Sequence, residues 1–142
     1  MNDLKERIFN LAQAPQLLNL ATITEEGKPW VRYVFGSADA ELNFRFCTSL
    51  CSDKIRHIRH NANVHLSLGA KDLMTAKEWL QVEGVAEIST AQAERHAFWN
   101  DGFLAYFTGP DDPNFCVVIV TPSLIELAAM GSMAAEVWQP GK

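Results

Sequence analysis

The stretch that decides the fold is LLNLATITEEGKPWVRYVFGS, residues 17–37. Two strand-like runs, over 17–24 and 27–37, are joined by the polar segment Glu25-Glu26-Gly27-Lys28, whose last two residues also begin the second run. Runs of β-branched and aromatic residues are typical of strands, and a short glycine-containing segment between two such runs is typical of a hairpin turn. The stretch therefore predicts two antiparallel strands joined by a turn built on Gly27.

A third strand is predicted directly after this hairpin, over residues 42–48. Leu42, Phe44 and Phe46 alternate there with polar or small residues, so one face of the strand is expected to join the core. Further apolar runs predict four more strands, over residues 63–69, 78–89, 115–122 and 123–130. Six or seven antiparallel strands with few helices between them predict a mainly β protein built as an antiparallel barrel.

Three short helices are expected at the edges of this barrel. Helical patterns occupy residues 1–14, 52–60 and 89–99. Ser52 is the expected N-cap of the second helix, and Ser89-Thr90-Ala91-Gln92 has capping-box spacing at the start of the third.

The composition is that of an ordinary globular protein. Its 142 residues are 48% hydrophobic and predict one domain over 1–142, with a tail over 130–142 that no pattern assigns. The net charge of −5 argues against a general attraction to nucleic acid or to anionic lipid. The amino terminus does not resemble a signal peptide, and no apolar run approaches the ~20 residues of a membrane-spanning helix. The three cysteines predict free thiols in a reducing cytoplasm.

The segment RFCTSLCSDKIRHIRHN, residues 45–61, concentrates the chemically active side chains. A metal site built from its cysteines and histidines is disfavoured, because structural zinc sites use tighter spacings. A redox pair of Cys47 and Cys51 is disfavoured because the chain has no Cys-x-x-Cys in a βαβ setting. The basic residues 54–60 could contact nucleic acid, but they equally describe a solvated helix face, and no stacking aromatic residue lies nearby.

A phosphate site explains more of this segment. The third strand delivers Thr48 and Ser49 at its end, and Ser52 precedes the next helix. Lys54 falls in the first turn of that helix, where a cation is unfavourable unless an anion joins it. Hydroxyls, helix amides and an ammonium group would then converge on a phosphomonoester. A capped helix with a solvated lysine remains the simpler alternative.

Three segments occur together in an order and spacing found in a known family. They are LATITEEGKPWVR at 20–32, FCTSLCSDKIRHI at 46–58 and LQVEGVAE at 80–87. The chain thus resembles the FMN-binding split β-barrel proteins named after pyridoxamine 5′-phosphate oxidase. A further segment, FWNDGFLAYFTGPDDPNFCVVIVTPSLIEL at 98–127, is similar to their bacterial general-stress-protein branch. The resemblance spans roughly residues 8–128.

This resemblance implies a six- to seven-stranded split barrel that forms a homodimer, with FMN at the subunit interface. The residues that match phosphate contacts in the family are Arg32, Thr48, Ser52 and Lys54, with Ser49 beside them. Those that match positions along the ribityl chain and the flavin ring are Tyr33, Val34, Cys47 and Gln81. Trp99 is expected to reach the ring from the neighbouring subunit.

The resemblance further implies an FMN-dependent oxidoreductase, and it assigns neither a substrate nor a catalytic residue. The name-giving oxidase activity is not expected. That enzyme recognises its substrate partly through Arg and His near its carboxyl end, whereas this chain has no Arg after Arg95 and no His after His96. One alternative is a non-catalytic flavin-binding stress, sensor or storage protein. Another is a split barrel that holds haem or a deazaflavin, with Cys47 or His65 as the available axial ligands for haem.

Overall fold

The structure of the protein is a computed structural model that describes residues 3–142. Its helices are α1 (Asp3–Ala12), α2 (Asp53–His60), α3 (Gln92–Phe98) and the 3-10 helix η1 (Asp101–Ala105). Its strands are β1 (Gln16–Ile23), β2 (Pro29–Ala38), β3 (Phe44–Ser49), β4 (Asn63–Leu68), β5 (Glu78–Ser89), β6 (Phe115–Ala129) and β7 (Glu136–Trp138).

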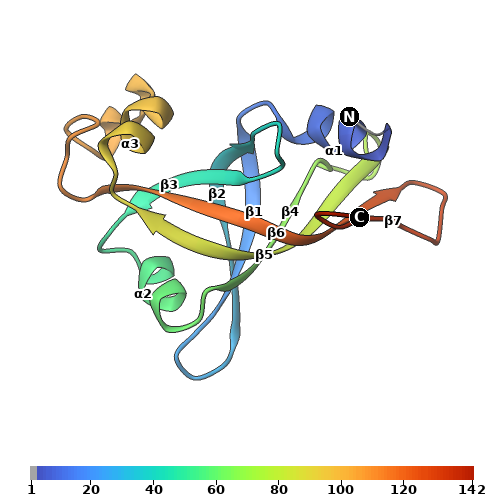
Figure 1. The fold of residues 1–142 in the computed structure, drawn as a ribbon, viewed down its shortest axis with the longest axis horizontal. Coiled ribbons are helices and arrows are strands. Elements are labelled where there is room, and N and C mark those ends of the chain that lie inside the picture. The colour runs from blue at the N-terminus through green and yellow to red at the C-terminus, as the bar shows by residue number, and fades with distance from the viewer. Residues whose placement is uncertain (1–2) are drawn as a thin grey trace.

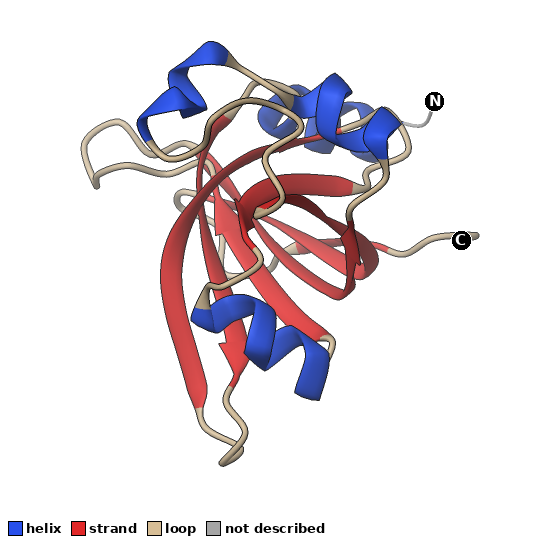
Figure 2. Cartoon of the chain, turned by 90° about the vertical axis from the view of Figure 1, so that its left-hand side faces the viewer, coloured by secondary structure: helices blue, strands red, loops and turns tan. Residues whose placement is uncertain are grey.

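Six of these strands close into an antiparallel barrel. The hydrogen-bonded order is β3-β2-β1-β4-β5-β6-β7, and an additional pairing of β3 with β6 closes the ring. Strand β7 extends the sheet beyond β6, and the short helices lie around the barrel (Figures 1 and 2). The mainly β antiparallel barrel with short peripheral helices that the sequence predicted is therefore confirmed.

The first hairpin forms where the sequence indicates it. All eight residues of β1 pair with β2, from Gln16 opposite Gly36 to Ile23 opposite Pro29. Gly27 has φ +81°, a value that L residues rarely adopt, which explains why the turn carries glycine there. Buried and more exposed residues alternate along β1, β3 and β5, and the buried set includes Phe44 and Phe46 of β3 as predicted.

The last long strand differs from the prediction. Residues 115–122 and 123–130 were expected to form two neighbouring strands, but β6 runs unbroken from Phe115 to Ala129. The register with β5 shifts at this point, because Glu83 pairs with Leu124 and Gly84 with Pro122. Ser123 is thus the extra residue of a β-bulge, which accommodates a proline inside a long strand without a chain reversal.

Of the two predicted helix caps, the position of Ser52 is confirmed and the capping box at Ser89 is not. Ser52 occupies the N-cap position of α2, but its side chain forms no capping hydrogen bond and instead accepts one from Thr48 Oγ1 at 3.1 Å. The capping box at Ser89 is wrong, since α3 starts later, with Ala91 at its N-cap and no side-chain cap. The end of β5 extends through Ser89, and this pairing with β6 takes precedence over a local cap.

The carboxyl-terminal tail, which no sequence pattern assigned, adds a strand and a core residue. Strand β7 pairs with β6, with Trp138 opposite Ile125. Trp138 is only 8% exposed and belongs to the main hydrophobic cluster. Arg7 of α1 donates to Glu136 of β7 and to Glu78 of β5, each at 2.9 Å, so the tail and the first helix are joined on one side of the barrel.

We expect Trp138→Ala to lower the free energy of unfolding by about 3 kcal/mol, because truncating a buried tryptophan removes apolar burial and leaves a cavity. Met133→Ala is the matched control, since Met133 is fully exposed in the same tail and its loss is expected to change stability by less than about 0.5 kcal/mol. Urea unfolding of both variants measures the difference. Equal midpoints would show that the tail does not contribute to the core.

Within residues 3–142, no helix is both long enough and apolar enough to cross a membrane.

Candidate functional site

A cavity of about 610 Å³ opens beside β2 and β3 and is bordered by the segment that follows α3. This volume lies within the range of roughly 300–1,000 Å³ that is usual for small-molecule and cofactor sites. Its lining residues are Leu17, Tyr33, Val34, Phe35, Cys47, Thr48, Ser49, Ser52, Lys54, Phe103, Tyr106, Phe107, Asp112 and Asn114. The set divides into a polar end and an apolar end.

The polar end is made where β3 stops and α2 begins. Lys54 Nζ donates to Thr48 Oγ1 at 2.9 Å, and Thr48 Oγ1 donates to Ser52 Oγ at 3.1 Å. Because Ser52 does not cap α2, no side-chain cap occupies the first amides of the helix. Two hydroxyls, an ammonium group and helix amides therefore gather in one place, as an anion site requires.

Two cations lie near this polar end without a carboxylate partner. Among residues 3–142, neither Lys54 nor Arg32 forms an ion pair with an acidic side chain. Burial, and then the nearby positive charge of Arg32, lower the pKa of Lys54. Burial likewise lowers the pKa of Arg32, with Asp53 opposing it. Half-buried cations that repel each other are relieved by a bound anion, so the charge distribution favours an anionic ligand.

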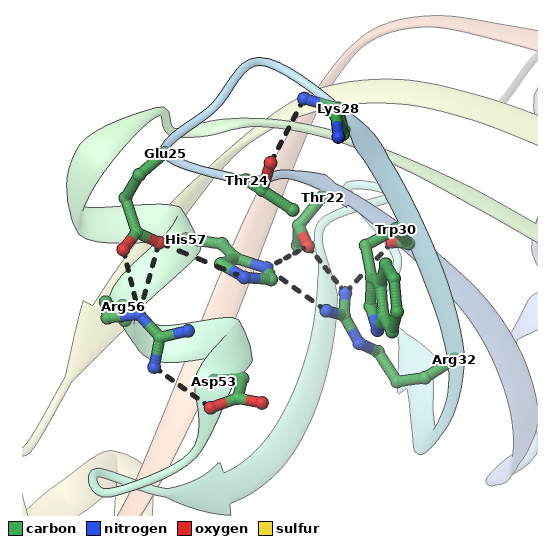
Figure 3. Close-up of polar contacts among 9 residues, drawn as sticks. All are labelled: Thr22, Thr24, Glu25, Lys28, Trp30, Arg32, Asp53, Arg56 and His57. Atoms are coloured by element: carbon green, nitrogen blue, oxygen red, sulfur yellow. Dashed lines mark hydrogen bonds and ion pairs between the residues drawn. The ribbon is translucent and has the colours of Figure 1, made fainter.

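The Arg32 side chain is held by a buried polar cluster rather than lying free on the strand. Its Nη1 donates to Thr22 Oγ1 at 2.7 Å, and its Nη2 lies 3.2 Å from His57 Nδ1 (Figure 3). Thr22 Oγ1 is 2.9 Å from the same His57 nitrogen. Thr22 and His57 are both buried, and they connect β1 and α2 behind the anion site.

The apolar end of the cavity is lined with aromatic rings. Phe103 of η1 contacts Phe35 of β2 edge to face, with ring centroids 6.3 Å apart, and Phe107 contacts Phe115 at 5.0 Å. Tyr33 and Tyr106 also line the cavity and remain largely exposed. An aromatic wall of this kind suits a planar, apolar ring system.

Cys47 lies in the wall of the cavity as an unreactive thiol. Burial raises its pKa to about 11, and burial raises the pKa of Cys116 to about 11 as well. Both side chains are therefore thiols near neutral pH, and the thiolate is the nucleophilic and metal-binding form. The three cysteines are free, and the structure describes no metal-binding cluster of His, Cys, Asp and Glu within residues 3–142.

We expect one thiol to react rapidly with a thiol reagent such as a disulfide dye at pH 7.5 in the folded, ligand-free protein. Cys51 is exposed, whereas Cys47 and Cys116 are shielded and have raised pKa values. Burial and protonation both slow the attack of a thiol on the reagent. A Cys51→Ser variant is expected to lose the fast phase, and three equally fast thiols would contradict this arrangement.

The structure brings together seven of the ten residues that the sequence singled out. Those that line the cavity are Tyr33, Val34, Cys47, Thr48, Ser49, Ser52 and Lys54. Arg32 lies behind them in the cluster with Thr22. Trp99 packs edge to face on Phe103, with ring centroids 5.7 Å apart, and thus supports the aromatic wall from within the same chain.

Gln81 is the residue that the structure separates from the others. It is exposed on β5, where it pairs with Ser67 of β4, and it does not line the cavity. His65, considered above as a haem ligand, is likewise exposed on β4 and outside the cavity. Neither residue therefore contacts a ligand held in this cavity within one chain.

Sequence reasoning missed the aromatic residues of the segment 103–107 and the buried His57. Residues 54–60 were described above as a basic and solvated helix face, yet His57 is 5% exposed. A usable signal was present, because His57 follows Lys54 by three residues and adjoins Ile58 on the buried side of the helix. For the aromatic segment no such signal exists, since an irregular loop has no periodicity that fixes where its side chains point.

Comparison of the sequence with known proteins finds a matching family and several similar proteins. The sequence profile described as pyridoxamine 5′-phosphate oxidase matches residues 4–128. General stress protein 26 of Bacillus subtilis (strain 168) is 29% identical over 129 residues, which are 91% of each protein. A pyridoxine/pyridoxamine 5′-phosphate oxidase of Vibrio parahaemolyticus is 27% identical over 117 residues, covering 82% of this chain but 50% of that enzyme.

Solved structures share the same architecture. The crystal structure of General Stress Protein 26 from Bacillus anthracis superposes with a TM-score of 0.84 at 25% identity, covering 97% of this chain and 99% of the other. A heme binding protein from Mycobacterium smegmatis has a TM-score of 0.73 at 19% identity over 95% of this chain and 56% of its own, which shows the fold alone. An F420 reductase has a TM-score of 0.66 at 26% identity over 82% and 93%. The same architecture is therefore shared by proteins with different names and roles.

Proposed function

This chain belongs to the pyridoxamine 5′-phosphate oxidase family, and we propose that it is an FMN-binding flavoprotein that acts as an oxidoreductase in a homodimer. The observation that carries the proposal is a pair of half-buried cations, Lys54 in the polar end of the cavity and Arg32 behind it, opposite an aromatic end. A phosphate joined by a flexible chain to a planar ring has the same division between a charged end and an apolar end.

The polar end fits the phosphate of FMN. A phosphomonoester carries about −1.5 to −2 charges near pH 7 and three acceptor oxygens. Lys54 supplies an ammonium group, Ser52 and Thr48 supply hydroxyls, and α2 supplies amides with no side-chain cap. Each of these groups donates hydrogen bonds, so the charge and the donor set both match a dianion.

The apolar end fits the flavin ring, and the exposed strands beside it fit a second subunit. Tyr33 and Phe35 line the cavity and also belong to the outer face of β1 and β2, together with Leu17 and Val31. Tyr33 is 70% exposed, which is unusual for an aromatic residue that lines a site. In the proposed homodimer a second copy covers this face, encloses the ring and brings Gln81 towards it.

Bound FMN would supply the hydride and electron transfer chemistry, and this chain would bind, orient and shield it. The match covers about half the length of the V. parahaemolyticus oxidase, and the proposal does not extend to the activity of that enzyme. Two titratable groups of the cavity are each held in one protonation state near neutral pH. Cys47 has a raised pKa, while Asp112 accepts from the backbone amides of Thr108 and Asn114, which lower its pKa and keep it ionised.

The raised pKa of Cys47, which keeps this thiol of the cavity wall protonated and unreactive, favours one second candidate, a protein that stores or senses FMN without turnover. The two functions differ in behaviour. An oxidoreductase is reduced by NADH or NADPH and reoxidised over many cycles, whereas a storage protein binds oxidised FMN and reacts slowly. Anaerobic mixing with each nicotinamide, followed by readmission of an acceptor, distinguishes them.

The visible absorption spectrum of the purified protein tests the proposal, before and after addition of FMN and dialysis. Flavin bands near ~375 and ~450 nm that survive dialysis are expected from a tightly bound FMN. A Soret band would instead indicate haem, and a single near-ultraviolet band would indicate a deazaflavin. A colourless protein that does not retain FMN would contradict the proposed function. Sedimentation velocity of the same sample tests the homodimer.

A further inference from the structure

The helix that carries Lys54 also carries a histidine with an unusual environment. His57 lies one turn after Lys54 on α2, and it is 5% exposed, although its neighbours Arg56 and His60 are exposed. Its Nδ1 atom lies 2.9 Å from Thr22 Oγ1 and 3.2 Å from Arg32 Nη2. A buried imidazole thus contacts one of the two cations of the proposed phosphate site (Figure 3).

The chemistry of the partners determines which nitrogen of His57 carries the proton. A guanidinium group has only donors, so the contact with Arg32 requires Nδ1 of His57 to accept. Thr22 Oγ1 accepts from Arg32 Nη1 at 2.7 Å, which leaves its own hydrogen to donate to the same Nδ1, so the two donors share the single lone pair of this nitrogen. His57 is therefore neutral in this arrangement and carries its proton on Nε2.

The opposite side of the ring agrees with this assignment. Nε2 of His57 faces Glu25 Oε1 at 4.0 Å, and this carboxylate favours a proton on Nε2. Arg56 holds Glu25 with contacts of 3.1 and 3.0 Å and also pairs with Asp53 at 2.9 Å. The charged groups around His57 thus place an anion beside Nε2 and a cation beside Nδ1 (Figure 3).

We propose that neutral His57 is the positioning residue that orients Arg32 towards the phosphate of FMN. The inference rests on the proposed function and adds to it a residue that does not itself contact the ligand. Nη1 of Arg32 donates to Thr22 and, at 3.4 and 3.3 Å, to the backbone oxygens of Leu20 and Trp30, whereas the one partner of Nη2 is His57 among residues 3–142. The guanidinium is thus oriented before the phosphate arrives. A long side chain loses considerable freedom on binding, and orienting it in advance reduces that entropy loss.

To orient Arg32 in this way, residue 57 must present a hydrogen-bond acceptor at the position of Nδ1. A leucine at position 57 would fill the buried space but leave Arg32 Nη2 and the Thr22 hydroxyl without an acceptor. An asparagine keeps a carbonyl oxygen at about the distance of Nδ1 from the backbone. The pair His57→Leu and His57→Asn therefore separates loss of the acceptor from loss of the ring.

The experiment measures dissociation constants of FMN and of riboflavin, which lacks the phosphate, by flavin fluorescence quenching for the parent protein and both variants. His57→Leu is expected to weaken FMN binding about 10-fold and riboflavin binding less than about 2-fold. His57→Asn is expected to remain within about 3-fold of the parent protein. In an Arg32→Ala background, His57→Leu is expected to have almost no further effect, because its effect acts through Arg32.

A measurement on the ligand-free protein makes the test independent of FMN. ¹⁵N NMR of the imidazole nitrogens is expected to show an acceptor-type Nδ1 and a protonated Nε2 for His57, and Arg32→Ala is expected to shift the Nδ1 signal. A protonated Nδ1 would overturn the inference even if His57→Leu fails to fold.

The outcomes separate the two proposals. If the parent protein does not bind FMN, the proposed function fails and the inference fails with it. If the parent protein binds FMN but His57→Leu weakens FMN and riboflavin equally, or acts as strongly without Arg32 as with it, only the inference fails. A phosphate-specific loss that asparagine restores and that Arg32→Ala abolishes supports both.

Discussion

Lys54→Met is expected to weaken FMN binding by about 100-fold and to leave riboflavin binding within about 3-fold of the parent protein. A hydrogen bond to a charged group contributes about 1.5–3 kcal/mol, and about 1.4 kcal/mol corresponds to a tenfold change in affinity. Lys54 lies at the upper end of this range because it is half-buried beside Arg32 and no acidic side chain of residues 3–142 neutralises it. Methionine retains the apolar stem, so the variant removes mainly the charge.

The pH dependence of binding provides a second signature of the same residue. In the free protein the pKa of Lys54 lies below its usual 10.5 because of burial and Arg32. The phosphate binds the charged ammonium, so FMN affinity is expected to be constant at neutral pH and to fall as the pH rises through this lowered pKa. Lys54→Met is expected to lack that alkaline decline. Fluorescence titrations between about pH 7 and 10 measure both.

The stability of the ligand-free protein is expected to change in the opposite direction. Because the pKa of Lys54 is lower in the folded chain than in the unfolded chain, the charged form is disfavoured by folding, and this cost is fully present below the folded pKa. Removing the charge is therefore expected to raise the melting temperature of the ligand-free protein at pH 7. Lys71→Met removes an exposed lysine and serves as the control. Equal FMN affinity in the Lys54 and Lys71 variants would show that the phosphate binds elsewhere.

Gly36→Ala is expected to lower the free energy of unfolding by about 4 kcal/mol, which is close to the entire stability of many small domains. Gly36 lies on β2 between β1 and β3, and a Cβ at this position would overlap the backbone carbonyl oxygen of Arg45. A backbone atom inside a barrel cannot move aside as a flexible side chain can, so β2 and β3 must separate.

The site is expected to respond to the same substitution. Strand β3 ends in Thr48 and Ser49, so a displaced β3 also moves the polar end of the cavity, and FMN affinity is expected to fall together with stability. Ser37→Ala is the matched control, because Ser37 is the adjacent residue of β2 and already carries a Cβ. Urea unfolding and FMN titration of both variants measure the two effects. A Gly36→Ala protein as stable as the control would contradict the close approach of β2 and β3.

Local patterns were sufficient to predict most of the barrel. The alternation of apolar and polar residues over 42–48 and 78–89 predicted which faces of β3 and β5 are buried. Successive side chains of a strand point to opposite faces whatever the strand packs against. Patterns failed where a tertiary contact decides the outcome. The bulge at Ser123 lets β6 continue past Pro122, and β7 forms only because the edge of β6 is available to it.

The candidate site divides in the same way. The sequence by itself determined the polar end, because Thr48, Ser52 and Lys54 lie within seven consecutive residues where a strand passes into a helix, and local geometry alone brings them together. Only the tertiary structure decided that Arg32 is held by Thr22 and His57, and that the rings of 103–107 form the opposite wall. These contacts join residues of an irregular loop, a helix and separate strands, and the contact between Phe35 and Phe103 joins positions 68 apart. Such distances carry no periodic signal, so barrel closure, rather than the spacing of residues along the chain, determines them.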